Sequence, residues 1–154
     1  MIAAPPSLGV KSLKELIALA KARPGELHYS SGGNGTSTHL AGELLKNAAG
    51  INLIHIPYKG VAPALTDTLA GQITITFAGV NAVRGFIETG KLRALGITGA
   101  RRNNAVPLVP TFAEAGLPGL DATTYRGLLA PAGTPTGAIT KLNAEFNKAL
   151  AHAP

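Results

Sequence analysis

The sequence predicts an α/β protein with a doubly wound, mostly parallel sheet flanked by helices. Short runs of strand-forming residues alternate at least three times with segments whose apolar residues recur at helical spacing, and turn residues separate them. Strands joined through helices pair in parallel because the crossover returns the chain to the edge from which it started. With 154 residues, of which 45% are apolar and 14% charged, the chain is long enough to bury a core.

The predicted elements begin with a helix that starts at a capping box, Ser12 to Glu15, and ends before Pro24. A strand over 27–29 then leads through a glycine-rich turn into a second helix that ends near Gly50. The further elements are a strand over 53–57, a helix over 63–71, a strand over 73–77, a helix over 81–89, a strand over 92–97, a short helix over 111–116, a strand over 125–130 and a last helix from 134.

The glycine-rich turn, residues 30–37, is the stretch around which the chain is organised. Its three glycines allow a tight backbone, and Thr36 or Ser37 is a good N-cap for the helix that follows. Such a turn leaves several backbone N–H groups at the positive end of a helix dipole, which is a typical anion site. A tight connection that binds no ligand is an equally open interpretation.

The turn matches no named catalytic motif. The phosphate loop needs a Lys after Gly35, where the chain has Thr36, and the dinucleotide pattern needs a Gly where it has Thr38. The nucleophile elbow needs a Gly where the chain has His39. A small stand-alone α/β enzyme that uses the turn as an oxyanion or phosphate cradle stays the alternative to a binding protein, and its turnover would depend on Ser37 or His39.

Two more turns, Tyr58–Gly60 and Ala78–Asn81, follow predicted strands. Ligands of open parallel sheets bind beyond the carboxyl ends of the strands, so we expect these turns to converge with the glycine-rich turn on one cleft. His39, in the first turn of the second helix, is a candidate to bind a ligand oxygen, and Lys59 a candidate to bind an anion. Arg126, in the predicted strand over 125–130, is a further candidate for an anionic partner.

Composition argues against several other classes of protein. The net charge is +6, but the cations are scattered and aromatic residues make up only 5%, so we expect no nucleic-acid partner; a basic interaction module is the third hypothesis. The chain has no cysteine, which excludes disulfides and thiolate sites. A metal site is not expected either, because His39 and Glu43 offer only two ligands.

Many short motifs in order resemble one known family, the tripartite tricarboxylate transporter receptors, which are Bug-type periplasmic solute-binding proteins. These motifs are YSSGGNGTSTHLAGEL at 29–44, HIPYKG at 55–60, APALTD at 62–67, LAGQ at 69–72, GKLRAL at 90–95, VPT at 109–111, EAGLPG at 114–119 and GLLAPAGTP at 127–135. The resemblance extends over nearly the whole chain. Ala78 stands where family members commonly carry an Asp, and Leu108 stands where an Asp often precedes Val-Pro-Thr.

The resemblance implies a lobe of a type II periplasmic-binding-protein fold that closes on a small organic acid and delivers it to a membrane permease. It implies no catalytic residue, metal or cofactor, and a periplasmic location. Backbone amides and hydroxyls of the glycine-rich turn would hold a ligand carboxylate, and the turns after Pro57 and Phe77 would form further walls. The ligand-binding residues expected are Ser31, Gly32, Gly33, Asn34, Gly35, Thr36, Ser37, His39, Tyr58, Lys59, Ala78 and Gly79.

Family members also carry a signal peptide and a further lobe, and the motifs quoted above correspond to neither of them. We therefore expect a fragment or an internally started chain, with a ligand-binding lobe over 1–123 and a crossover strand and C-terminal helix over 124–154. The last helix has one apolar face, formed by Ile139, Leu142, Phe146 and Leu150. Without a lobe to cover, this face is expected to pair with a second copy of the chain, as a homodimer.

Overall fold

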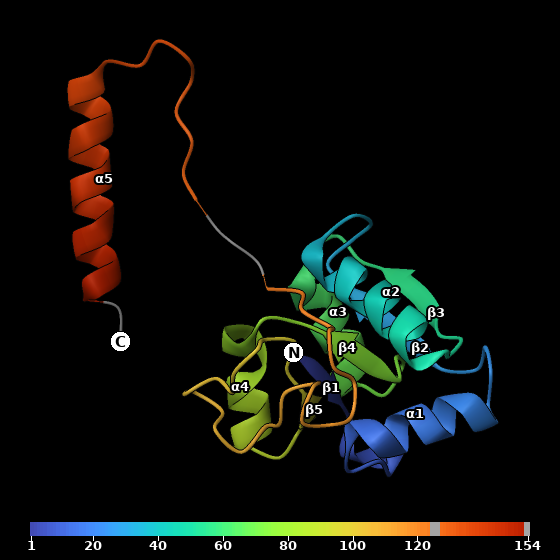
Figure 1. Ribbon diagram of the computed structural model, residues 1–154. Helices are drawn as coiled ribbons and strands as arrows, with labels where there is room; N and C mark the ends of the chain where they lie inside the picture. Colours follow the sequence, from blue (N-terminus) through green and yellow to red (C-terminus); the bar gives the residue numbers. More distant parts are fainter. Residues whose placement is uncertain (124–126, 153–154) are drawn as a thin grey trace. The chain divides into compact units, whose positions relative to one another are not determined.

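The computed structural model describes residues 1–123 and 127–152, and the chain divides into two compact units, Met1–Thr124 and Tyr125–Pro154 (Figure 1). In chain order the elements are β1 (Ile2–Ala4), the 3-10 helix η1 (Pro6–Leu8), α1 (Leu13–Ala22), β2 (His28–Ser31), α2 (Ser37–Ala49), β3 (Ile54–Pro57), α3 (Val61–Leu69), β4 (Ile75–Phe77), α4 (Val80–Glu88), β5 (Arg93–Gly96) and α5 (Thr136–Ala151). The first unit contains every strand of the described residues.

The five strands form one sheet in the order β3-β2-β4-β1-β5. β2 pairs in parallel with β3 and β4, whereas β1 pairs antiparallel with β4 and β5, so four strands run in one direction and one opposes them. The mostly parallel α/β fold is therefore confirmed. The antiparallel β1 was not predicted, because three apolar residues before Pro5 and Pro6 have no periodicity that distinguishes a strand.

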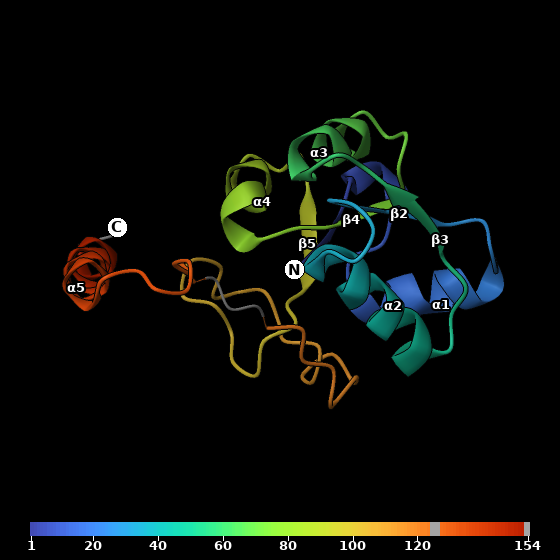
Figure 2. The ribbon, with the colours of Figure 1, turned by 90° about the horizontal axis from the view of Figure 1, so that it is seen from above.

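Helices cover both faces of this sheet, as a doubly wound fold requires (Figure 2). Side chains of α1 and α2 pack with one set of strand residues, including Tyr29, Ile75 and Phe77. Side chains of α3 and α4 pack in a second cluster with Ala3 and Leu92. Alternate strand residues point to opposite faces, so both faces of β1 are buried: Ile2, Ala3 and Ala4 are each at most 1% exposed.

Local signals mark the starts of α1 and α2. Ser12 caps α1 by accepting a hydrogen bond from the Glu15 amide at 3.2 Å, but the Glu15 carboxylate accepts from Lys11 N at 2.8 Å rather than from the Ser12 amide of a capping box. Thr36 caps α2 by accepting from His39 N at 3.4 Å. The sequence left Thr36 and Ser37 open as the N-cap, and in the structure the cap is Thr36.

The predicted short helix over 111–116 is wrong, although its capping box forms. Thr111 N donates to the Glu114 carboxylate at 2.7 Å, and Glu114 N donates to the Thr111 hydroxyl at 3.1 Å. The segment remains a series of turns, because Gly116 has a φ of +92° and Pro118 follows. Arg102 also donates to the Glu114 carboxylate, at 2.9 Å, which ties the long connection after β5 to itself.

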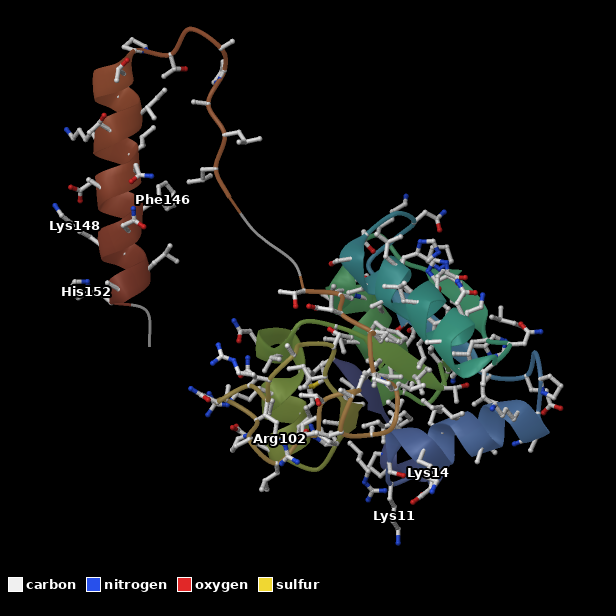
Figure 3. The ribbon with its side chains drawn as sticks, in the orientation of Figure 1. Lys11, Lys14, Arg102, Phe146, Lys148 and His152 are labelled. Atoms are coloured by element: carbon white, nitrogen blue, oxygen red, sulfur yellow. The ribbon has the colours of Figure 1, made fainter. Side chains whose placement is uncertain are left out.

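The predicted strand over 125–130 is not found in its described part, since residues 127–130 have no strand structure. Tyr125 and Arg126 lie outside the described residues, and so does the proposed anionic contact of Arg126. In the Tyr125–Pro154 unit, the apolar and charged faces of α5 separate clearly, with Phe146 and Lys148 on opposite sides of the helix (Figure 3). An apolar groove of about 850 Å³ lies along the apolar face, lined by Leu128, Leu129, Ile139, Leu142, Phe146 and Leu150 among others.

We predict that Gly42→Ala destabilises the fold by about 1–3 kcal/mol, the usual range for overpacking a core. A Cβ at Gly42, in α2, would lie 2.3 Å from Cε2 of the fully buried Tyr29, so the ring or the helix must shift. Gly85→Ala in α4 is the matched control, because nothing lies within 4 Å of its Cβ. For this control the free energy of unfolding is expected to rise by about 0.5–1 kcal/mol, because alanine has less backbone freedom to lose on folding than glycine. Urea unfolding measures both, and an equal effect of the two variants would contradict the packing.

A second prediction concerns the 154-residue chain prepared with a free amino group at Met1. This group donates to Ala78 O at 3.0 Å in a buried position, while Ala78 N donates back to Met1 O at 3.1 Å. Burial lowers the pKa of this ammonium group from 8.0 to about 6. The unfolded chain then binds more protons between pH 6 and 8, so stability rises with pH across this window, by about 2–3 kcal/mol.

The control for this prediction is a chain with two glycines added before Met1, in which an uncharged peptide N–H makes the same bond to Ala78 O. Thermal unfolding from pH 6 to 8 is expected to show a clearly smaller rise in the free energy of unfolding for the extended chain. Equal slopes in the two chains would show that the Met1 amine is not the titrating group.

Candidate functional site

The glycine-rich turn joins the carboxyl end of β2 to the N-terminus of α2. Gly33 and Gly35 have φ angles of +129° and +73°, a region that side-chain-bearing residues rarely adopt. Thr36 fixes the last part of the turn, since its hydroxyl donates to Gly33 O at 2.7 Å and its amide donates to the same oxygen at 3.3 Å. The turn is thus held by its own backbone and hydroxyl groups.

Side chains satisfy three amides of the turn. Gly32 N donates to the Thr38 hydroxyl at 3.0 Å, and Gly33 N donates to the Ser31 hydroxyl at 3.1 Å. Gly35 N donates to Nδ1 of His39 at 3.1 Å. These three amides are therefore occupied, and the expectation of outward-pointing amides fails for them.

Three other amides of the turn and the first helical turn have no acceptor among residues 1–123 and 127–152. They belong to Asn34, Ser37 and Thr38. Asn34 and Ser37 are exposed, and the amides of Ser37 and Thr38 lie at the positive end of the α2 dipole. This group of three donors is the part of the turn that is left for an anion.

The turn after β3 lies directly against the glycine-rich turn. Tyr58 N donates to Ser31 O at 3.2 Å, and Gly60 N donates to Gly32 O at 3.1 Å. Two of the three predicted walls are therefore brought together. Tyr58 itself is occupied, because its hydroxyl donates to Asp67 at 2.6 Å; burial and this carboxylate raise the pKa of Tyr58 to about 12. Lys59 is exposed and makes no hydrogen bond or ion pair within the described part of the chain.

The third predicted wall, Ala78 and Gly79, follows β4 at the same edge of the sheet. Ala78 is only 2% exposed, and its side chain belongs to the apolar cluster under α3 and α4. Gly79 is exposed and precedes the first residue of α4. No hydrogen bond joins either residue to the glycine-rich turn in the described ranges, so this wall is related to the others only by the parallel pairing of β2 with β4.

Three stacked aromatic rings lie next to the glycine-rich turn and contact it through hydrogen bonds. His39 of α2 stacks on His55 of β3 with ring centroids 4.1 Å apart, and His55 stacks on Tyr29 of β2 at 4.8 Å. The Ser31 hydroxyl lies 2.7 Å from Nε2 of His55. His55 is thus hydrogen-bonded within the sheet, and it also connects β3 to the turn.

A chain of polar contacts leads from the buried Tyr29 of this stack to the surface. The Tyr29 hydroxyl donates to Glu43 at 2.7 Å, and Lys46 Nζ donates to both oxygens of Glu43 at 2.9 and 3.0 Å. Burial raises the pKa of Glu43, but the hydrogen bonds from Tyr29 and Lys46 outweigh it and hold the pKa below its usual value. Burial, with the charge of His39, lowers the pKa of His55, which favours its neutral imidazole.

Sequence reasoning missed Thr38 and the Tyr29–Glu43–Lys46 chain. Thr38 was not distinguished from its neighbouring hydroxyl residues, because its importance comes from facing Gly32 N across the turn. Glu43 follows His39 by one helical turn, and this spacing was the only signal that placed it near the site.

The arrangement suits anion binding better than nucleophilic chemistry. Ser31 and His55 form a serine–histidine pair, but Ser31 is fully buried and its hydroxyl already accepts the Gly33 amide. Ser37, the nucleophile that an enzyme hypothesis needs, makes no side-chain hydrogen bond to a base in the described residues. No group of three or more metal-binding side chains occurs in the described part of the chain, and no described helix is long and apolar enough to cross a membrane.

Relatives of known sequence are similar along most of the chain. "Protein BugT" of Bordetella pertussis is 40% identical over 145 residues, which cover 94% of this chain and 44% of that protein. A Pseudomonas sp. (strain P51) protein from the tcbD-tcbE intergenic region is 43% identical over 142 residues, covering 92% of this chain and 42% of that one. The chain thus spans less than half the length of these relatives.

Solved structures give the same result. The structure "R. palustris Rpa4515 with adipate" is 38% identical with a TM-score of 0.90, over 94% of this chain and 48% of that one. "MatC (Rpa3494) from Rhodopseudomonas palustris with bound malate" is 29% identical with a TM-score of 0.91, over 99% of this chain and 52% of the other. Another neighbour, periplasmic binding protein BugD, is 33% identical with a TM-score of 0.85, over 92% of this chain and 47% of that one.

The family profile described as "Tripartite tricarboxylate transporter family receptor" matches residues 1–154. The resemblance drawn from the short motifs is thereby confirmed. The chain belongs to the tripartite tricarboxylate transporter receptor family.

Proposed function

We propose that this chain contributes the glycine-rich wall of a solute-binding site for a small carboxylated metabolite. The observation that carries the proposal is the group of three amides, of Asn34, Ser37 and Thr38, that have no acceptor in the described residues. They lie at the N-terminus of α2, beyond the carboxyl ends of parallel strands. A carboxylate oxygen is the small anion that such amides accept with charge-assisted hydrogen bonds.

The ligands of two structural neighbours support the carboxylate class, since one neighbour holds adipate and the other malate. Both are dicarboxylates, so one carboxylate on the turn leaves a second for the opposite wall. In the full receptor that wall comes from outside this chain, which covers about half of each neighbour. The side chain of Ala78 is buried and apolar and offers no polar group to the ligand. The selection of one carboxylate over another therefore depends on the other walls of the site.

The proposed setting is that of the family: a periplasmic receptor that delivers its ligand to a membrane permease and catalyses no reaction. The buried Ser31–His55 pair and the family assignment both favour a receptor over the enzyme alternative. No nucleic-acid partner is proposed, because cations that include Lys46, Arg84 and Arg102 are engaged in ion pairs with their own chain.

We also propose that the apolar face of α5 is an interface. In the Tyr125–Pro154 unit its members are 46% to 71% exposed, and they line one groove with Leu128 and Leu129. Burying a large aliphatic or aromatic side chain stabilises by about 1.5–3 kcal/mol, so this face is expected to be covered. For the chain alone, the expected cover is a second copy, which pairs as a symmetric dimer.

The first prediction here concerns the turn. Gly35→Val places a β-branched residue at a φ of +73° and is expected to abolish binding of malate or adipate, whereas Ser37→Ala should change it little, because the Ser37 amide is retained. Gly50→Val at the other end of α2, at a φ of +60°, is the control for backbone strain without a site. Ligand-induced NMR shifts measure binding. Loss of binding in Gly50→Val equal to that in Gly35→Val would argue against the turn.

The second prediction concerns α5. Phe146→Lys places a charge in the apolar groove and is expected to convert a dimer of the chain to a monomer. Asn147→Lys is the control: it adds the same charge at a polar residue that also lines the groove, and it should leave the dimer in place. Light scattering measures the mass of each variant. A monomeric parent chain, with the α5 amides protected from hydrogen exchange, would contradict pairing.

A further inference from the structure

The His39 side chain contacts the backbone of the glycine-rich turn directly. Its Nδ1 accepts the Gly35 amide at 3.1 Å, so the neutral ring carries its proton on Nε2. The ring is only partly buried, unlike its partner Tyr29 at the far end of the stack, which is fully buried. Water and ligand can therefore reach His39, and any proton it gains must be placed on Nδ1.

A proton on Nδ1 would remove the acceptor of the Gly35 amide. Two donors, Gly35 N–H and His39 Nδ1–H, would then face each other across 3.1 Å, an arrangement that is unfavourable until an acceptor intervenes. A carboxylate oxygen accepts from both donors, and its negative charge pairs with the imidazolium. Protonation thus adds one amide and one cation to the three free amides of the turn.

We propose that His39 couples ligand binding to proton uptake: a carboxylate bound at the turn displaces Nδ1 from the Gly35 amide, and the released nitrogen takes a proton from solvent. The inference rests on the proposed function, because it describes the same anion site. One N–H···N hydrogen bond is replaced by two hydrogen bonds to carboxylate oxygen. The only bond formed is N–H at Nδ1, and its proton comes from the acid form of the buffer, which is left as the conjugate base.

The charged groups that face His39 favour this step. On α2, Glu43 carries a negative charge one helical turn along, and Lys46 is paired with that carboxylate at 2.9 Å. On β3, His55 stacks against the ring at 4.1 Å; its burial lowers its pKa, which favours the neutral form of this ring beside His39. On β2, Tyr29 is uncharged, since burial and Glu43 raise its pKa.

The test follows the His39 ring by NMR while pH is varied from 5 to 8, with and without malate. Malate is expected to raise the midpoint of the His39 titration by about 0.5–1 pH unit, which corresponds to about three- to tenfold tighter binding by the protonated form. His152, which lies in α5 of the other unit, is the internal control and should not move. An unchanged His39 midpoint in a sample that binds malate overturns the coupling.

The matched variant is His39→Asn, whose Oδ1 can occupy the position of Nδ1 and accept the Gly35 amide but cannot take a proton. It is expected to bind malate with a flatter pH profile than the parent chain; protonation of malate itself is common to both and cancels. Parallel profiles in the two proteins overturn the coupling while leaving the proposed function intact. No binding of malate or adipate by the parent chain at any pH overturns the proposed function and the coupling with it.

Discussion

The parallel pairing of β2 with β3 is the constraint on which the site depends. Their register places Ser31 opposite Pro57, so both strands end at the same level. The pairing then continues beyond the strands as two backbone hydrogen bonds, from Tyr58 N and Gly60 N to the glycine-rich turn. Two loops that are far apart in the sequence become one surface because the sheet ends them together.

Packing between β2 and α2 sets the angle at which the helix leaves the turn. Tyr29 fills the space against Gly42, where even a methyl group would overlap the ring. The same tyrosine stacks on His55 and donates to Glu43, so one buried side chain contacts both the core and the polar chain behind the site. Because cores are close-packed, a shift of α2 would also displace the backbone amides of Ser37 and Thr38 at its N-terminus.

Most of the turn proposed as the anion site is held in place by its own side chains. The hydroxyls of Ser31 and Thr38 and the ring of His39 accept hydrogen bonds from three backbone amides of the turn. The remaining amides, of Asn34, Ser37 and Thr38, belong to a backbone that these hydrogen bonds already order, which lowers the entropic cost of binding an anion. A preorganised turn of this kind can serve different carboxylates, since backbone amides recognise the charge rather than the rest of the ligand.

The sequence alone was enough for the α/β class, four of the strands and the family, because these follow from local periodicity, turn residues and short motifs. It left the N-cap of α2 open between Thr36 and Ser37, and only the structure decided for Thr36. It was not enough for β1, whose antiparallel place between β4 and β5 comes from non-local pairing. Nor could it separate occupied amides from free ones, since the acceptors of Gly32 and Gly35 lie on the next helix. Ala78 was placed in the binding wall by its position after a strand, and only the packing of both sheet faces decided that its side chain belongs to the core.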